Sequence, residues 1–228
     1  MAAAIWMIIY DLDRAHSDRY LQWFNEVHIP EKLARPGYTW AAHYEVIADD
    51  DSADARYIAL FGGSDSRVFY NPSPAQIKPS QPPETRQMMS YRSNSNMFIL
   101  SEDWIFDGDP GSLETSPCIN AESISLALFN ANGKDENLGA WLVQDYLVNY
   151  AAAGVTRKLL ASTGSVRHVV VHEIEPPESP LPDAPLNTMT RTTMADASSS
   201  DWSAQVSDYL DYPAGPPLVA RRVWPGAG

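Results

Sequence analysis

His28 is the side chain in this sequence best suited to acid–base chemistry. An imidazole has a pKa near neutrality, so it can accept and return a proton in a dehydration, an isomerisation or a ring closure. Helical periodicity places His28 on an apolar stripe with Tyr20 and Phe24. The same position suits a core histidine whose ring nitrogens bond to backbone carbonyls or to a tyrosine. Both interpretations stay open from the sequence alone.

His43 and Tyr44 are the candidates for a second catalytic group. They are adjacent in a predicted strand and therefore face opposite sides of it, so at most one of them shares a cavity with His28. A tyrosine there could polarise a carbonyl or hold an enolate oxygen. We prefer Tyr44 because its face also carries Tyr38 and Trp40, although burial against helices is the commoner fate of a strand tyrosine.

Aromatic residues concentrate in the first half of the chain, where they could line an apolar ligand site. The predicted substrate-binding set is Tyr10, Trp23, Phe24, Trp40, Phe61, Phe98 and Trp104. Core packing explains most of these side chains without a ligand. Their concentration nevertheless favours the first half as the place of the pocket.

Other chemistries lack a sequence signature. His168 and His172 lie on one face of a single predicted strand with Val170 between them, but no third metal ligand can be identified by spacing, so we expect no metal site. Cys118 is the only cysteine and has no recognisable histidine partner. The sequence contains no GxSxG, GxGxxG or Walker loop, which argues against nucleophilic hydrolysis and nucleotide use.

The elements that must position these residues occur twice in the same order. In each half we expect strand, helix, strand, strand, helix, strand, which is the ferredoxin-like pattern. Gly37 and Gly154, Trp23 and Trp141, and Trp104 and Trp224 are separated by about 117 to 120 positions. In the first half we expect strands at 5–10, 38–47, 56–61 and 97–106 with helices from 17 and at 84–91. In the second half we expect strands at 123–129, 155–161, 166–174 and 218–224 with helices at 136–153 and 200–210. The predicted repeats are residues 1–110 and 111–228, joined at 108–117.

Charge and composition exclude several partners. The 228 residues carry 16 Lys and Arg against 29 Asp and Glu, a formal net charge of −13. Nucleic acid and acidic membrane surfaces require clustered cations, which are missing from this sequence.

The apolar N-terminus has no preceding Lys or Arg and is read as a strand rather than a signal peptide, and no segment is long and apolar enough to be a membrane helix. A single cysteine suits a reducing compartment, so we expect a cytoplasmic protein.

The segment Trp23-Phe24-Asn25-Glu26-Val27-His28-Ile29-Pro30, followed by Pro36-Gly37-Tyr38, resembles the EthD-like members of the dimeric α+β barrel superfamily. In that superfamily two ferredoxin-like units pack sheet against sheet, usually in a homodimer. The resemblance implies an α+β fold in which two ferredoxin-like repeats of one chain form an intramolecular dimeric α+β barrel. Such a molecule could be a monomer with an internal pseudo-dimer, or a homodimer of these.

The resemblance also implies a pocket for small aromatic, lactone or polyketide-like metabolites. We expect a cofactor-independent lyase or isomerase, with dehydratase or cyclase chemistry, in which His28 transfers the proton and Tyr44 or His43 orients an oxygen. Two alternatives remain: a haem-binding protein or cofactor-free oxygenase of the same superfamily, and a non-catalytic small-molecule-binding protein. His28 aligns with Asp145 or Tyr146 in the second half, so that half is expected to be degenerate.

Overall fold

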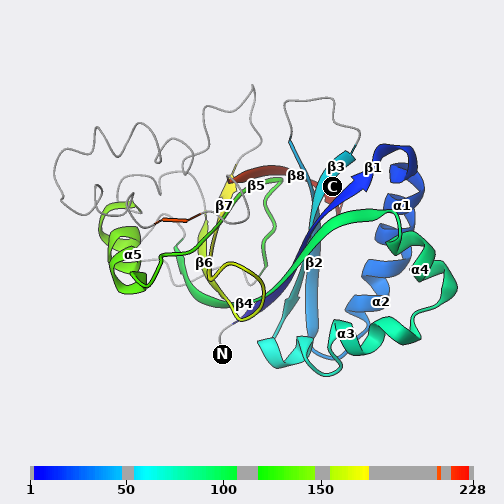
Figure 1. Ribbon diagram of the computed structural model, residues 1–228, viewed down its shortest axis with the longest axis horizontal. Coiled ribbons are helices and arrows are strands. Elements are labelled where there is room, and N and C mark those ends of the chain that lie inside the picture. The colour runs from blue at the N-terminus through cyan, green and yellow to red at the C-terminus, as the bar shows by residue number, and fades with distance from the viewer. Residues whose placement is uncertain are drawn as a thin grey trace.

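Eight antiparallel strands close into a barrel in the computed structural model, which describes residues 3–47, 54–106, 118–146, 155–174, 210–211 and 217–225 (Figure 1). The strands are β1 Ala4–Asp13, β2 Tyr38–Val46, β3 Asp54–Gly63, β4 Arg92–Phe106, β5 Ser123–Phe129, β6 Thr156–Ala161, β7 His168–Ile174 and β8 Leu218–Trp224. All eight predicted strands are present. β4 begins earlier than expected because Arg92 and the residues after it pair with the far end of β1.

The strand order around the barrel is β1-β3-β2-β8-β5-β7-β6-β4. Around the barrel, the first four strands lie in the order β4-β1-β3-β2 and the last four in the order β8-β5-β7-β6. β5, β6, β7 and β8 thus take the same places in the second set as β1, β2, β3 and β4 in the first. The two sets meet where β2 pairs with β8 and where β4 pairs with β6. We call the described residues up to 106 the N-terminal half and those from 118 the C-terminal half.

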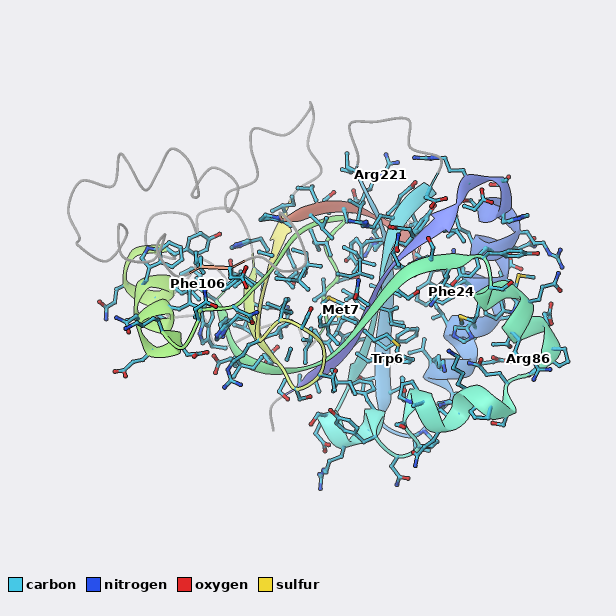
Figure 2. All side chains as sticks on the ribbon, in the orientation of Figure 1. Trp6, Met7, Phe24, Arg86, Phe106 and Arg221 are labelled. Atoms are coloured by element: carbon cyan, nitrogen blue, oxygen red, sulfur yellow. The ribbon has the colours of Figure 1, made fainter. Side chains whose placement is uncertain are left out.

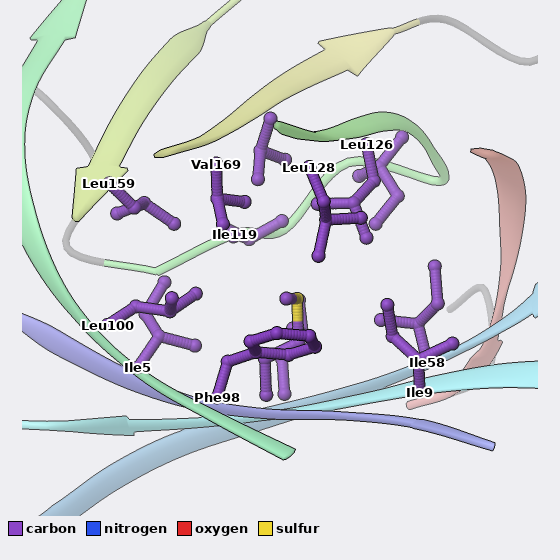
Figure 3. Packing of buried hydrophobic residues seen from close by; sticks show 14 of the residues in the cluster. Ile5, Ile9, Ile58, Phe98, Leu100, Ile119, Leu126, Leu128, Leu159 and Val169 are labelled. Carbon is purple, nitrogen blue, oxygen red and sulfur yellow. The ribbon is translucent and has the colours of Figure 1, made fainter. Parts of the chain in front are cut away.

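Alternate residues of all eight strands point into the barrel and fill it with aliphatic side chains. The interior contains Ile5, Ile9, Ile58, Phe98, Leu100, Ile119, Leu126, Leu128, Leu159 and Val169, among others (Figure 3). These residues come from both halves. The interior is therefore a hydrophobic core shared by both sets of strands, and a ligand site is more readily built on the outer faces of the strands.

Helices cover the outer face of the N-terminal strands (Figure 1). They are α1 Ser17–Trp23, a π-helical segment η2 Phe24–His28, α2 Ile29–Leu33, α3 Pro74–Ile77 and α4 Pro83–Met89, with short 3₁₀ turns η1 Arg14–His16, η3 Ser66–Phe69 and η4 Lys78–Ser80. The chain widens into the π-helical turn η2 just before Pro30. Pro30 then occupies the first turn of α2, where its missing N–H costs little.

The C-terminal strands carry helix α5 Asp135–Trp141 and a second π-helical segment, η5 Leu142–Tyr146. Leu138, Trp141 and Leu142 pack onto Ala127 and Val170 of the sheet. The predicted junction at 108–117, the insertion after β7, the end of the helix expected to 153 and most of the helix expected at 200–210 lie outside the described residues. No described helix has the length and apolarity needed to cross a membrane.

Candidate functional site

The structure separates the predicted site residues into three environments. Tyr10, Trp23, Phe24 and Phe61 lie between the N-terminal sheet and its helices. Trp40, Tyr44 and Phe98 belong to the barrel interior, and Trp104 packs in the cluster beneath α5. Figure 2 shows the division along one strand, where Trp6 lies toward the helices and its neighbour Met7 toward the barrel interior.

His43 and Tyr44 lie on opposite faces of β2, as strand alternation requires. His43 is fully buried on the helix-covered face. Tyr44 points into the barrel, where its hydroxyl donates to the carbonyl oxygen of Ala121 at 3.0 Å. The structure therefore brings His43, and not Tyr44, to the side of the sheet on which His28 lies. Trp40 shares the interior face with Tyr44, but Tyr38 packs in the cluster on the helix side. The predicted common face of Tyr38, Trp40 and Tyr44 is therefore wrong, because the register of β2 shifts between Tyr38 and Trp40.

A hydrogen-bonded chain runs through His43. The Tyr10 hydroxyl lies 2.8 Å from His43 Nε2, and Asn25 Oδ1 of the π-helical segment lies 3.3 Å from His43 Nδ1. Burial raises the pKa of Tyr10, so its hydroxyl stays protonated and donates to Nε2. The Nδ1–H of His43 then donates to Asn25. Burial first, and the positive charge of Arg92 second, lower the pKa of His43 to about 3, which keeps the imidazole neutral.

Arg92, the first residue of β4, lies over this chain inside an aromatic box. The carbon of its guanidinium lies 3.8 Å from the ring centroid of Tyr10, 4.9 Å from that of Phe24 and 5.2 Å from that of Tyr20. Its Nε donates to the Tyr20 hydroxyl. Its Nη2 is buried without a hydrogen-bond partner. A buried, unpaired N–H of a cation is costly, so Arg92 is poised to receive an oxygen of a ligand.

His28 lies at the edge of the same cluster. Its ring stacks on Trp23 at 4.8 Å and on Phe24 at 5.3 Å between centroids. Phe24 also contacts the ring of His43, at 4.7 Å between centroids, so this phenylalanine touches both imidazoles. Burial, and then the charge of Lys32, lower the pKa of His28 to about 2, and its Nδ1 is buried without a partner. His28 is therefore a neutral imidazole with one nitrogen available.

A polar cavity of about 340 Å³ adjoins the cluster through Arg92. It is lined by Asp13, His16, Asp54, Ser90, Tyr91, Arg92 and Ser93. Asp13 and Asp54 are direct partners in the pairing of β1 with β3. The His16 ring stacks on Tyr91 at 4.2 Å between centroids. The volume falls within the range of small-molecule sites, about 300 to 1,000 Å³. Arg92 therefore belongs both to the lining of this cavity and to the cluster around Tyr10.

Sequence reasoning missed Arg92, Asn25 and Tyr20. Arg92 falls in a stretch without clear periodicity, and its approach to Tyr10 depends on the pairing of β4 with β1, which joins positions about 80 apart in the chain. Asn25 contacts His43 because the helix widens at η2. Tyr20 was placed on the buried stripe of the helix, but nothing in its type or spacing indicates a bond to Arg92.

The C-terminal half holds two further buried histidines. His168 Nε2 lies 2.6 Å from Asp135 Oδ1. His172 is hydrogen-bonded through Nε2 to the Tyr146 hydroxyl and through Nδ1 to Thr156 Oγ1, the latter at 2.8 Å. In the described part of the chain, no group of three or more His, Cys, Asp or Glu side chains could hold a metal ion.

No protein-family model and no curated protein sequence matches this chain. Solved structures do match it along almost all of its length. An anthrone oxidase-like protein is 10% identical, with a TM-score of 0.56 over 97% of this chain and 91% of that chain. A candidate monooxygenase from Fusobacterium nucleatum subsp. nucleatum is 8% identical, with a TM-score of 0.53 over 97% and 93%. A candidate chlorite dismutase is 15% identical, with a TM-score of 0.51 over 98% and 95%.

These similarities, together with the closed barrel of eight strands, place the chain in the dimeric α+β barrel fold. The identities are too low to carry more than the fold from one protein to another. The expected α+β barrel with ferredoxin-like strand order is thus confirmed, and the EthD-like assignment stays a prediction.

A haem-binding protein is one of the alternatives, so each buried histidine is considered as an axial ligand. An axial ligand needs an imidazole nitrogen aimed at a space for the macrocycle. Both ring nitrogens of His43 and of His172 are hydrogen-bonded, whereas His168 is bonded to Asp135 through Nε2 and its Nδ1 has no partner. The His28 ring is packed against Trp23 and Phe24. His43 and His172 therefore have no ring nitrogen free to ligate an iron.

Proposed function

We propose that this protein is an enzyme that removes a proton from a small hydroxylated aromatic or keto metabolite and holds the resulting enolate or phenolate against Arg92. The observation that carries the proposal is the Tyr10–His43–Asn25 chain lying directly under the guanidinium of Arg92. A base, a proton carrier and a buried cation in contact are the parts that enolate chemistry needs. No cofactor is required for this step.

The low pKa of His43 fits this role because it depends partly on Arg92. An enolate oxygen bound to the guanidinium cancels much of its charge. His43 then becomes more basic as the negative charge develops, so proton transfer and anion stabilisation support each other. In this mechanism Tyr10 accepts the substrate proton at its oxygen while it passes its own proton to His43 Nε2. Asn25 holds the Nδ1–H and fixes the orientation of the ring.

The cavity beside Arg92 indicates the kind of substrate. Asp13 and Asp54 would accept hydrogen bonds from hydroxyl groups and repel a carboxylate, whereas the stacked His16 and Tyr91 rings offer a flat surface. A neutral polyhydroxylated aromatic compound fits these walls. The substrate meets Arg92 from the cavity, and rotation of the guanidinium away from the Tyr10 ring brings the acidic C–H to the Tyr10 oxygen.

The enolate has two possible fates, which define two candidate functions. Return of the proton at another position, or loss of a leaving group, gives the isomerase or lyase. Reaction with O₂ gives an oxygenase, in which a CH₂ becomes C=O, one oxygen atom enters the product and the other leaves as water. The second candidate is supported by the anthrone oxidase-like and monooxygenase structures of the same fold.

The distinguishing experiment follows anthrone, a C–H acid, in D₂O with the purified protein. We expect enzyme-dependent exchange of the CH₂ protons by NMR, and Arg92→Gln should slow it at least 100-fold because the anion loses its cation. An oxygen electrode run in parallel separates the functions: O₂ uptake matching loss of anthrone identifies an oxygenase, and exchange without uptake an isomerase or lyase. Absence of both, with anthrone and with a panel of phenols and lactones, would contradict the proposal.

We also propose that the barrel is a fusion of two ferredoxin-like repeats, 1–110 and 111–228. The equivalent strand orders of the two halves support it, as do ring pairs at corresponding places. Tyr10 lies opposite Tyr57 in β1·β3, with centroids 5.8 Å apart, and Phe129 lies opposite His168 in β5·β7, 5.9 Å apart. Tyr10 and Phe129 differ by 119 positions, within the spacing seen in the sequence. Such a chain is a monomer with an internal pseudo-dimer or a homodimer of these, and sedimentation velocity would distinguish the two.

A further inference from the structure

The outer face of the C-terminal sheet is unusually polar for a buried surface. β5, β7 and β6 present a row of side chains, Ser125, His172 and Thr156, that are direct partners across the two strand pairings. Each is buried, and Ser123 continues the row along β5. The corresponding face of the N-terminal sheet is largely aromatic. Burying hydroxyls and an imidazole in this way is unfavourable unless they find hydrogen-bond partners.

Two of these hydroxyls find none. Ser123 Oγ and Ser125 Oγ are buried without a hydrogen-bond partner, although two positions apart on one strand they point to the same side. Ser125 lies directly opposite His172 in the pairing of β5 with β7. The Cβ atoms of directly opposite residues in antiparallel strands are generally about 4.5 to 5.5 Å apart. Unpartnered buried hydroxyls in a native protein call for a partner from outside the chain, either water or a ligand.

His172 is the centre of a hydrogen-bonded chain like that of His43. Its Nε2 is bonded to the Tyr146 hydroxyl and its Nδ1 to Thr156 Oγ1. In both halves a tyrosine hydroxyl meets Nε2 of a buried histidine, and a side-chain oxygen meets Nδ1. The two chains are built from different positions, since His43 lies on β2 and His172 on β7. The second half therefore does not simply repeat the first site.

The two chains differ in charge. Arg92 lies over the first, whereas burial alone lowers the pKa of His172, to about 4. Lys158 follows Thr156 by two residues and lies on the same face of β6. Its Nζ lies 3.2 Å from Asp103 Oδ2, so this cation is already ion-paired. Arg221 of β8 is the direct partner of Ser123 and lies exposed at the end of the row. Ser125 and His172 have only uncharged direct partners, so a charged ligand lying between these two would lose its hydration without gaining an ion pair.

We propose that the C-terminal half contains a second small-molecule site, formed by Ser123, Ser125, His172, Tyr146 and Thr156, for an uncharged ligand bearing hydroxyl or carbonyl oxygens. The serine hydroxyls donate to an oxygen of the ligand, and the Tyr146–His172–Thr156 chain fixes the wall against which it lies. This site is independent of the enolate site around Arg92. The C-terminal half is then a binding unit and not a degenerate copy.

Calorimetric titration with resorcinol, an uncharged dihydroxy aromatic compound, tests this site. We expect Ser123→Ala/Ser125→Ala to weaken one class of resorcinol binding at least tenfold, whereas Ser101→Ala, on β4, leaves it unchanged. The double variant should fold and melt at the same or a higher temperature, because it removes only unpartnered hydroxyls. Benzoate, the anionic probe, should bind at this site at least tenfold more weakly than resorcinol.

His43→Gln separates the two sites. Resorcinol binding that survives His43→Gln and is lost in the double serine variant supports the second site, whatever the fate of the enolate mechanism. No resorcinol binding in the wild type, or an unchanged isotherm in the double serine variant, would mean that the hydroxyls hold only internal water, and would overturn the proposal. Equal binding of benzoate would overturn the uncharged ligand class.

Discussion

At the scale of single residues, His28 and His43 are the two buried histidines of the N-terminal half and both are neutral, but only His43 is part of a proton-carrying chain. His43 is bonded on both ring nitrogens, whereas Nδ1 of His28 has no partner. The sequence pointed to His28 because of its place in a helix and its resemblance to a family motif. It could not reveal that the partner of Tyr10 would be His43, since that contact joins β1 to β2 across the intervening β3.

Replacing each histidine by glutamine should separate their roles. We expect His43→Gln to lower kcat for proton exchange at least 100-fold, because glutamine cannot take a proton from Tyr10. His28→Gln should change kcat less than tenfold and act mainly on KM, since His28 lines the cluster without joining the chain. Stopped-flow measurement of the exchange rates checks both variants. A larger loss of kcat in His28→Gln than in His43→Gln would assign the proton transfer to His28.

At the scale of elements, periodicity predicted the strands well because each alternates between the barrel core and an outer face. β5 and β8 have the predicted bounds. The π-helical turns η2 and η5 could not be predicted, because widening of a helix is decided by what it packs against. Asn25 belongs to the widened turn η2 and contacts His43 from there, so this contact could not be predicted from the sequence.

One end of the barrel is closed by a buried ion network that also escaped prediction. Arg157 of β6 is almost fully buried and bonds to Glu173 of β7 at 3.0 Å and to Glu102 of β4 at 3.2 Å. Glu173 also accepts the backbone N–H groups of Asn120 and Ala121, which lie just before β5. The network thus connects strands of both halves where β4 meets β6.

Arg157→Met should therefore destabilise the protein by about 3 to 5 kcal/mol, because it leaves a buried carboxylate without its cation. Arg167→Met is the matched control: its ion pair with Asp135 is largely exposed and should be worth less than about 1 kcal/mol. Urea unfolding followed by tryptophan fluorescence measures both free energies of unfolding. Equal effects of the two variants would show that the buried network adds nothing to stability.

At the scale of the whole molecule, the strand order, the shared core and the similarity to solved structures agree on one closed barrel. The repeated order of elements in the sequence led to the correct fold class because both halves follow the same pattern. The residues of the candidate site were harder to predict than the fold. Tyr44 and Trp40 face the barrel core, and no sequence pattern indicated Arg92.

The buried histidines make stability of the whole molecule depend on pH. Burial is the first cause of the lowered pKa values of His28, to about 2, of His43, to about 3, and of His172, to about 4. The unfolded chain, with ordinary values near 6.5, therefore binds more protons than the folded protein below that pH. Stability is fully present above about pH 6.5 and falls as the pH drops, by about 1.4 kcal/mol per pH unit for each histidine.

Between pH 5.5 and 4.5 unfolding should take up close to three protons from these groups. The free energy of unfolding, measured in urea at a series of pH values, gives the proton uptake as a slope, to which His168 adds because burial also lowers its pKa. His172→Gln should remove about one proton from it. A slope near zero in this range would mean that the three histidines are accessible to protons in the folded state.

The central claim, that Tyr10 and His43 carry a proton beneath Arg92, is tested most directly by comparing two tyrosine variants in the anthrone exchange measurement. Tyr10→Phe and Tyr44→Phe each remove one buried hydroxyl from a strand of the N-terminal half, and each breaks a hydrogen bond. The account predicts that exchange falls at least 100-fold in Tyr10→Phe and stays within about twofold of the wild type in Tyr44→Phe, with both variants folded. Exchange preserved in Tyr10→Phe, or lost equally in both, would contradict it.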